Sequence, residues 1–169
     1  MLDRHSAEHE PARLRGNQYL RMAFNLPVED DDPDHPWPPY AVETLWVEAL
    51  GEDRYRVDNI PFFVKPLAVD DIVRGQRSES DLTSELVWFS GRLEWSGRST
   101  VRVIIFSDED EILTTLNDMG CSYERLRQII AVDIPNGKLV ERAHAFLTAK
   151  QLSGALDLEE ACLPDSFLH

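Results

Sequence analysis

Residues 43–63, ETLWVEALGEDRYRVDNIPFF, constrain the fold more than any other stretch of the chain. The apolar run at 45–47 contains β-branched and aromatic residues, which suit the half-buried surface of a strand. Residues 51–53 are polar, begin with glycine and interrupt that pattern as a hairpin loop does. Apolar and charged residues then alternate over 55–58, with the two-residue period of a strand, until Pro61 stops the ladder. The stretch therefore predicts a β-hairpin.

The charge of the chain narrows the classes of partner. Its 169 residues are 43% hydrophobic, which is enough for one compact domain or two small ones. The 31 Asp and Glu residues outnumber the 17 Lys and Arg residues, and the net charge is −14. Nucleic acids and anionic membranes are bound through Lys and Arg, so this balance argues against both. It favours a basic protein partner, with plain solubility as the alternative explanation.

The N-terminal part of the chain combines a tail, a strand and an acidic loop. Residues 1–16 are polar and without periodicity, and we expect them to be a disordered tail. Residues 18–26 alternate as a strand does. Residues 27–40, PVEDDDPDHPWPPY, hold five prolines and a run of acids, so neither a helix nor a ladder can continue there. We expect a long loop held by Trp37 and Tyr40 against the domain.

The stretch after the hairpin continues as a β-rich domain, which we place at residues 17–98 and expect to be barrel-like. The adjacent carboxylates at 70–71 would point to opposite faces of a strand, so turn formation explains them better than acid–base catalysis does. Two short strands are expected at 86–89 and 93–95, around the Ser-Gly-Arg of 90–92. A second Ser-Gly-Arg stands at 96–98, and either copy suits a bulge or, alternatively, an anion.

The second half has the pattern of an α+β domain, which we place at residues 99–165. A nearly continuous apolar strand at 101–106 predicts a central position in a sheet. Ser107 is expected to cap the helix that follows, with Asp110 in the capping-box position. Later elements are expected in the order strand, strand, helix, strand, at 121–127, 128–135, 139–154 and 156–163, the last of which could also be helical. This β-α-β-β-α-β order predicts a ferredoxin-like sandwich with strand order 4-1-3-2.

No motif in the sequence indicates catalysis, a metal or a cofactor. Four of the five histidines lie in tails or in the proline-rich loop. His144, on the second helix, has Glu141 as the carboxylate placed to meet it, and two ligands fall short of a metal site. There is no nucleophile elbow, phosphate loop or dinucleotide fingerprint. Cys121 and Cys162 fall on opposite sheet edges in the predicted order, so we expect two free thiols and a cytoplasmic location.

Several motifs resemble a bacterial family known only as domain of unknown function 4265. The most specific is the Asn-Ile-Pro-Phe segment that ends the opening hairpin. The matching residues lie at 43, 45–47, 55–62, 71–73, 96–103, 120–121, 124 and 131–135. The resemblance implies a bacterial origin and a recurrent module, and it brings no activity, cofactor or catalytic residue.

The leading hypothesis is a non-catalytic acidic binding or inhibitor protein, for instance of the immunity type, that acts on a basic partner. The acid runs at 29–34 and 108–111 look too dense to pair with bases of this chain, and the hypothesis needs them to converge on one face. Its candidate residues are Asp30, Asp31, Asp32, Trp37, Asp108 and Glu109. The alternative is an enzyme or small-ligand sensor with a site between the two halves. Its candidate residues are Glu43, Asp58, Asn59 and Arg102.

Overall fold

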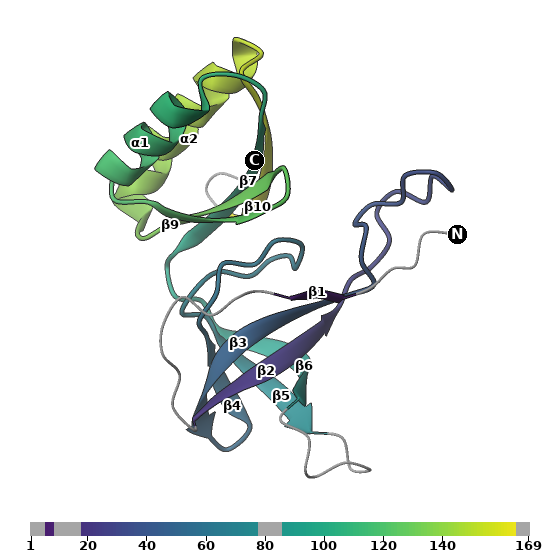
Figure 1. The fold of residues 1–169 in the computed structure, drawn as a ribbon. Helices are drawn as coiled ribbons and strands as arrows, with labels where there is room; N and C mark the ends of the chain where they lie inside the picture. Colours follow the sequence, from purple (N-terminus) through teal and green to yellow (C-terminus); the bar gives the residue numbers. More distant parts are fainter. Residues whose placement is uncertain (1–5, 9–17, 78–85, 165–169) are drawn as a thin grey trace. The chain divides into compact units, whose positions relative to one another are not determined.

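The computed structural model describes residues 6–8, 18–77 and 86–164, and it is an α+β structure (Figure 1). The chain divides into two compact units. One contains Met1–Asn59 and Asp70–Glu94, and the other contains Ile60–Val69 and Trp95–His169. Within the expected tail, Ser6–Glu8 form strand β1, and the rest of residues 1–16 lies outside the described residues. The expected domain boundaries at 17–98 and 99–165 stay predictions. Among the described helices, none is long and apolar enough to cross a membrane.

The first unit is a closed five-stranded barrel. Its strands are β2 (Tyr19–Asn25), β3 (Val42–Gly51), β4 (Arg54–Val57), β5 (Ile72–Arg77) and β6 (Leu86–Glu94). They pair in the order β3-β2-β6-β5-β4, and β4 pairs back onto β3. The β3–β4 pair is the hairpin that the opening stretch predicts. β1 pairs in parallel with the first residues of β3, Val42–Thr44, and is not one of the five barrel strands.

Alternate residues of the barrel strands fill its interior. Leu20, Met22 and Phe24 of β2 are buried, and they stand opposite Val47, Leu45 and Glu43 of β3. The strands read from residues 18–26 and 55–58 are thus confirmed, and Ala23, between Met22 and Phe24, is buried as well. Residues 86–95 were expected to form two short strands, and that expectation is wrong. Residues 86–94 form the single strand β6, and Trp95 lies beyond its end. The pairing of β6 with β5 shifts register twice, so bulges absorb the polar Ser-Gly-Arg segment without ending the strand.

The second unit pairs a four-stranded antiparallel sheet with two helices. Its elements are β7 (Ser99–Ile105), α1 (Glu109–Asp118), β8 (Ser122–Leu126), β9 (Ile129–Ile134), α2 (Gly137–Leu152) and β10 (Leu156–Cys162). The sheet order is β10-β7-β9-β8, so β7 is central as its apolar sequence predicts, and the order 4-1-3-2 is confirmed. Residues 156–162 are strand, which decides between the two alternatives for this segment.

Both helices cover one face of this sheet (Figure 1). Ile112, Leu113 and Leu116 of α1 are buried, as the apolar spacing predicts. On α2 the buried residues are Val140, Ala143 and Leu147. These side chains pack with alternate residues of β7 and β9, so the core of the unit lies between the sheet and the helices.

The start of α1 differs from the expected capping box. The N-cap is Asp108, whose backbone is left-handed (φ 58°, ψ 29°), and no side chain caps the helix. Ser107 instead donates its backbone N–H to the Ala155 carbonyl, 3.2 Å away. The loop between β7 and α1 is therefore held by the neighbouring strand connection, which the spacing Ser107 to Asp110 does not reveal.

Segment 60–69 covers part of the helix-free face of the sheet. Thr100 and Arg102 alternate along β7 with the core residues Val101 and Val103, so they point to the face away from the helices. The Thr100 hydroxyl donates to the Leu67 carbonyl (3.0 Å), and the Arg102 guanidinium donates to the Phe62 carbonyl. Both Phe62 and Phe63 are buried.

Candidate protein-interaction site

The acidic loop at residues 27–40 is closed at its base by backbone hydrogen bonds. Trp37 donates its N–H to the Asp30 carbonyl (2.8 Å), and Asp30 donates back to the Trp37 carbonyl (3.1 Å). Below this bridge, the Leu26 N–H donates to the Ala41 carbonyl (2.9 Å). The loop projects beyond the ends of β2 and β3 in Figure 1. These bonds give a proline-rich segment a defined conformation without a regular element.

The carboxylates at the tip of this loop face solvent. Asp30, Asp31 and Asp32 are all exposed. One oxygen of Asp30 accepts the Asp32 N–H (3.1 Å), and one oxygen of Asp32 accepts the Asp34 N–H (3.0 Å). His35 Nδ1 lies 3.9 Å from Asp32 Oδ2, and no Lys or Arg of the described residues forms an ion pair with these three acids. Trp37 is half-buried, so part of its ring is already shielded.

The acids at the start of α1 have a different environment. Lys150 Nζ lies 2.9 Å from Glu111 Oε1 and 3.8 Å from Asp108 Oδ2, and Arg125 Nη2 lies 2.5 Å from Glu109 Oε1. The hydrogen bond to Glu111 raises the pKa of Lys150. The expectation that this run is too dense to pair internally is therefore wrong, because bases from distant elements reach it.

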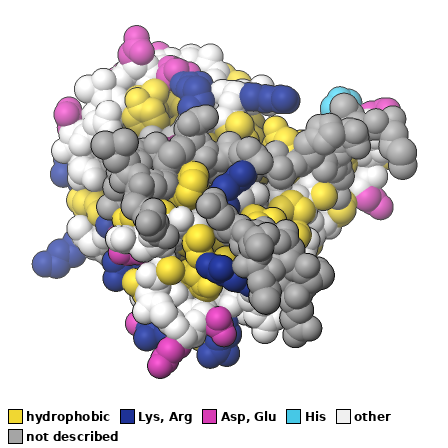
Figure 2. Space-filling model, turned by 60° about the horizontal axis from the view of Figure 1, so that its bottom comes forward, with side chains coloured by type: hydrophobic (Ala, Val, Ile, Leu, Met, Phe, Trp, Pro, Cys, Tyr) yellow, Lys and Arg dark blue, Asp and Glu magenta, His cyan; other side chains and the backbone are white. Residues whose placement is uncertain are grey.

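Acidic side chains do not form one continuous patch on the face drawn in Figure 2. Magenta acidic groups are scattered there among dark blue basic ones. The net charge alone therefore does not define a site on that face. Asp30–Asp32 belong to the barrel unit and Asp108–Glu111 to the sheet unit, so their convergence stays a prediction.

The residues of the alternative pocket hypothesis lie in different units. Glu43, Asp58 and Asn59 belong to the barrel unit, and Arg102 belongs to the sheet unit. Asn59 is buried, and its side-chain oxygen accepts the Trp46 N–H (2.7 Å), while the Asp58 N–H donates to the Trp46 carbonyl (3.0 Å). These two bonds satisfy the backbone N–H and carbonyl of Trp46 on β3, next to the end of β4. Convergence with Arg102 stays a prediction.

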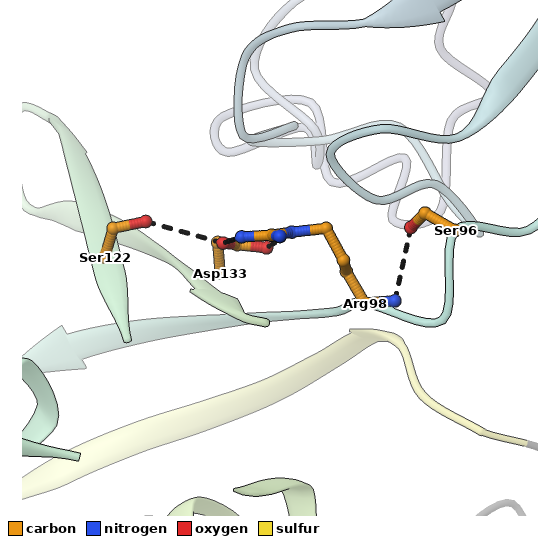
Figure 3. Close-up of polar contacts among 4 residues, drawn as sticks. All are labelled: Ser96, Arg98, Ser122 and Asp133. Carbon is orange, nitrogen blue, oxygen red and sulfur yellow. Dashed lines mark hydrogen bonds and ion pairs between the residues drawn. The ribbon is translucent and has the colours of Figure 1, made fainter. Parts of the chain in front are cut away.

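Sequence reasoning missed a buried carboxylate on β9 and its arginine (Figure 3). Asp133, only 2% exposed, accepts Arg98 Nε at 2.9 Å on one oxygen and Arg98 Nη2 on the other. Ser122 Oγ also reaches Asp133 (3.4 Å), and Ser96 Oγ accepts the Arg98 N–H (3.2 Å). A charged residue inside the apolar run 129–134 was the available signal. The pairing occupies the Arg98 guanidinium, so this Ser-Gly-Arg copy supports a structural more than an anion-binding role.

Cys121 and His144 are the two described side chains of the second unit whose chemistry the sequence left open. Burial, and secondarily the charge of Asp133, raise the pKa of the Cys121 thiol to about 11. A thiol with this pKa is protonated at neutral pH. Because only the thiolate is a good nucleophile, Cys121 is poorly suited to nucleophilic attack at neutral pH. His144 pairs with Glu160 of β10 (2.5 Å) and not with the expected Glu141. Within the described ranges, no three His, Cys, Asp or Glu side chains gather as a metal site would require.

Comparison with protein-family models gives a match over residues 43–158, to the family described as Domain of unknown function (DUF4265). The chain belongs to this family. The DUF4265 match runs from β3 to β10 and includes Asp108 and Glu109, whereas the acidic loop with Asp30 and Trp37 precedes it.

A solved structure has the same fold as this DUF4265 chain. It is titled "Novel crystal structure of a hypothetical protein from Neisseria gonorrhoeae" and has a TM-score of 0.68 at 19% sequence identity. The alignment covers 88% of this chain and 98% of that one. The likeness supports the mixed α+β architecture of a barrel and a sheet with two helices. The comparison with curated proteins gives no match.

Proposed function

We propose that this DUF4265 protein is a non-catalytic acidic binding protein, for instance an inhibitor or immunity-type protein, that acts on a basic protein partner. The observation that carries the proposal is the set of exposed carboxylates of Asp30, Asp31 and Asp32, which have no Lys or Arg partner among the described residues. Elsewhere in the chain exposed acids do find bases, as Glu109 and Glu111 do. Charge that no described Lys or Arg offsets is available to a partner.

The loop is suited to fast electrostatic association. Complementary charge raises association rates, and a loop that is already ordered loses less conformational entropy on binding. The Asp30–Trp37 backbone bridge supplies that order. The exposed part of Trp37 would add apolar contact, because hot spots are enriched in aromatic residues.

We also propose two finer features of the protein. Strand order 4-1-3-2 with both helices on one face supports a ferredoxin-like sandwich for the second unit. Buried, free Cys121 and Cys162 fit a reducing compartment, which supports a cytoplasmic location.

The proposal is tested by capturing the partner from a native cell extract and measuring association rates from low to physiological salt. D30N/D31N/D32N removes three charges and keeps the oxygens that accept the Asp32 and Asp34 N–H groups. We expect slower association and a flatter salt dependence, because rim charges chiefly set the association rate. E52Q/D53N/E141Q removes the same charge from exposed positions elsewhere and should leave the rate near that of wild type. A wild-type rate that does not depend on salt would refute the electrostatic proposal.

A second variant separates the role of the aromatic ring from that of the charges. Trp37→Ala keeps the acids and removes the half-buried ring, so we expect faster dissociation from the captured partner with a nearly unchanged association rate. Surface plasmon resonance measures both rates. An unchanged dissociation rate would exclude Trp37 from the interface.

A further inference from the structure

Two apolar side chains of the sheet unit are unusually exposed. Phe106, directly after β7, is 63% exposed, and Leu152, the last residue of α2, is 84% exposed. They are the two most exposed large apolar residues in the part of the chain that the structure describes. Single exposed apolar residues are common, so their meaning depends on whether they lie together.

Backbone hydrogen bonds bring the two residues to the same end of the unit. The Phe106 and Ser107 N–H groups both donate to the Ala155 carbonyl, at 2.8 and 3.2 Å. Ala155 in turn donates its N–H to the Lys150 carbonyl (3.0 Å), in the last turn of α2. The connection after β7 therefore lies against the connection after α2, and Figure 1 shows these two loops side by side.

The surroundings of this apolar pair are predominantly acidic. Asp108, Glu109, Asp110 and Glu111 follow Phe106 directly and are all exposed. Lys150 and Arg125 offset part of this charge. No Lys or Arg among the described residues pairs with Asp110, so the rim keeps a net negative charge.

We infer that Phe106 and Leu152 form the apolar centre of a docking surface for a basic protein segment, with Asp108–Glu111 as its charged rim. The inference rests on the proposed function and names the chemistry of its partner: an apolar side chain flanked by Lys or Arg. Apolar contacts at the centre supply affinity, and rim charges supply the association rate and orientation. A second copy of this chain docked through the same surface is disfavoured, because each rim keeps a net negative charge after Lys150 and Arg125 are counted and the two rims would repel each other.

The test uses a fluorescein-labelled amphipathic peptide of lysine and leucine, with the same peptide carrying glutamate for lysine as its control. Binding to the full chain is measured by fluorescence anisotropy and mapped by amide chemical shifts. We expect the lysine peptide alone to bind, with the largest shifts at residues 106–111 and 150–155. F106S/L152S should weaken binding roughly tenfold, the scale of hot-spot loss. L50S/L93S removes two exposed leucines of the barrel unit and should have no such effect.

The two proposals fail in different ways. Equal binding by wild type and F106S/L152S, or shifts concentrated at residues 27–40, would overturn the docking surface and leave the proposed function standing. Failure of the lysine peptide to bind at low salt would also overturn it. The proposed function is judged separately, by the salt dependence of the captured partner. Both substituted residues are exposed, so thermal unfolding of F106S/L152S should match that of wild type.

Discussion

At the scale of single residues, Gly75 has the least room of any glycine in the described barrel. A Cβ at this position would lie 2.5 Å from both Met22 Cε and Val87 Cγ1, and 3.2 Å from Tyr55 Cε2. Gly75→Ala should therefore destabilise the protein by about 1–3 kcal/mol through overpacking. Gly91, on the neighbouring strand β6, has no atom within 4 Å of its added Cβ, so Gly91→Ala is the matched control. Urea unfolding of the two variants checks this, and equal midpoints would contradict it.

The charge of Asp133 should affect the pH at which the Cys121 thiol reacts. Burial and the Asp133 charge both oppose ionisation and raise the pKa of Cys121 to about 11. Removing the charge should favour the thiolate, so in a Cys162→Ser background Asp133→Asn should shift alkylation of Cys121 to lower pH. Iodoacetamide labelling between pH 8 and 10, followed by mass spectrometry, measures the shift. Asp133→Glu keeps the charge and should keep the wild-type pH profile, and a lowered profile there would argue against the electrostatic cause.

At the scale of elements, segment 60–69 shows how an irregular stretch can be a core component. Phe62 is 2% exposed, and its carbonyl accepts a hydrogen bond from Arg102 on β7. Phe62→Ala should cost about 3–5 kcal/mol as a core truncation. The same substitution at exposed Phe106 should cost less than about 0.5 kcal/mol. Chemical denaturation distinguishes the two, and a small cost at Phe62 would mean that the segment detaches easily.

Elements with a strong apolar period could be predicted from sequence, and those shaped by distant partners could not. Val101 and Val103 mark a strand because β7 is buried on both sides, and Ile112 and Leu116 mark a helix stripe. The prediction that Ser107 caps α1 was wrong because the Ser107 backbone is held by Ala155, which lies far along the chain. The candidate site follows the same rule: the acid runs are visible in the sequence, but the ion pair of Glu111 with Lys150, 39 residues away, is not.

At the scale of the whole molecule, the two thiols report on the strand order. Cys121 directly precedes the edge strand β8, and Cys162 ends the opposite edge strand β10. Three strand spacings separate these edges, roughly 14 Å, whereas a disulfide needs Cα atoms within about 7 Å. Thiol titration of the unfolded, unreduced protein should find two free thiols. A result of none would contradict the topology of the second unit.

Segment 60–69 also affects how the chain is made and inherited. It leaves the ribosome before β7 and β10 have been synthesised, although Leu67 accepts a hydrogen bond from Thr100 of β7 and Lys65 pairs with Glu159 of β10. The carbonyls of Phe62 and Leu67 therefore lack their partners on β7, Arg102 and Thr100, until after the last two barrel strands, β5 and β6, have been made. The second unit contains residues from both sides of β5 and β6. No single cut in the gene therefore separates the two units. Recombination at one breakpoint in β5 or β6 would separate segment 60–69 from β7 and β10, so the two units are expected to be passed on together.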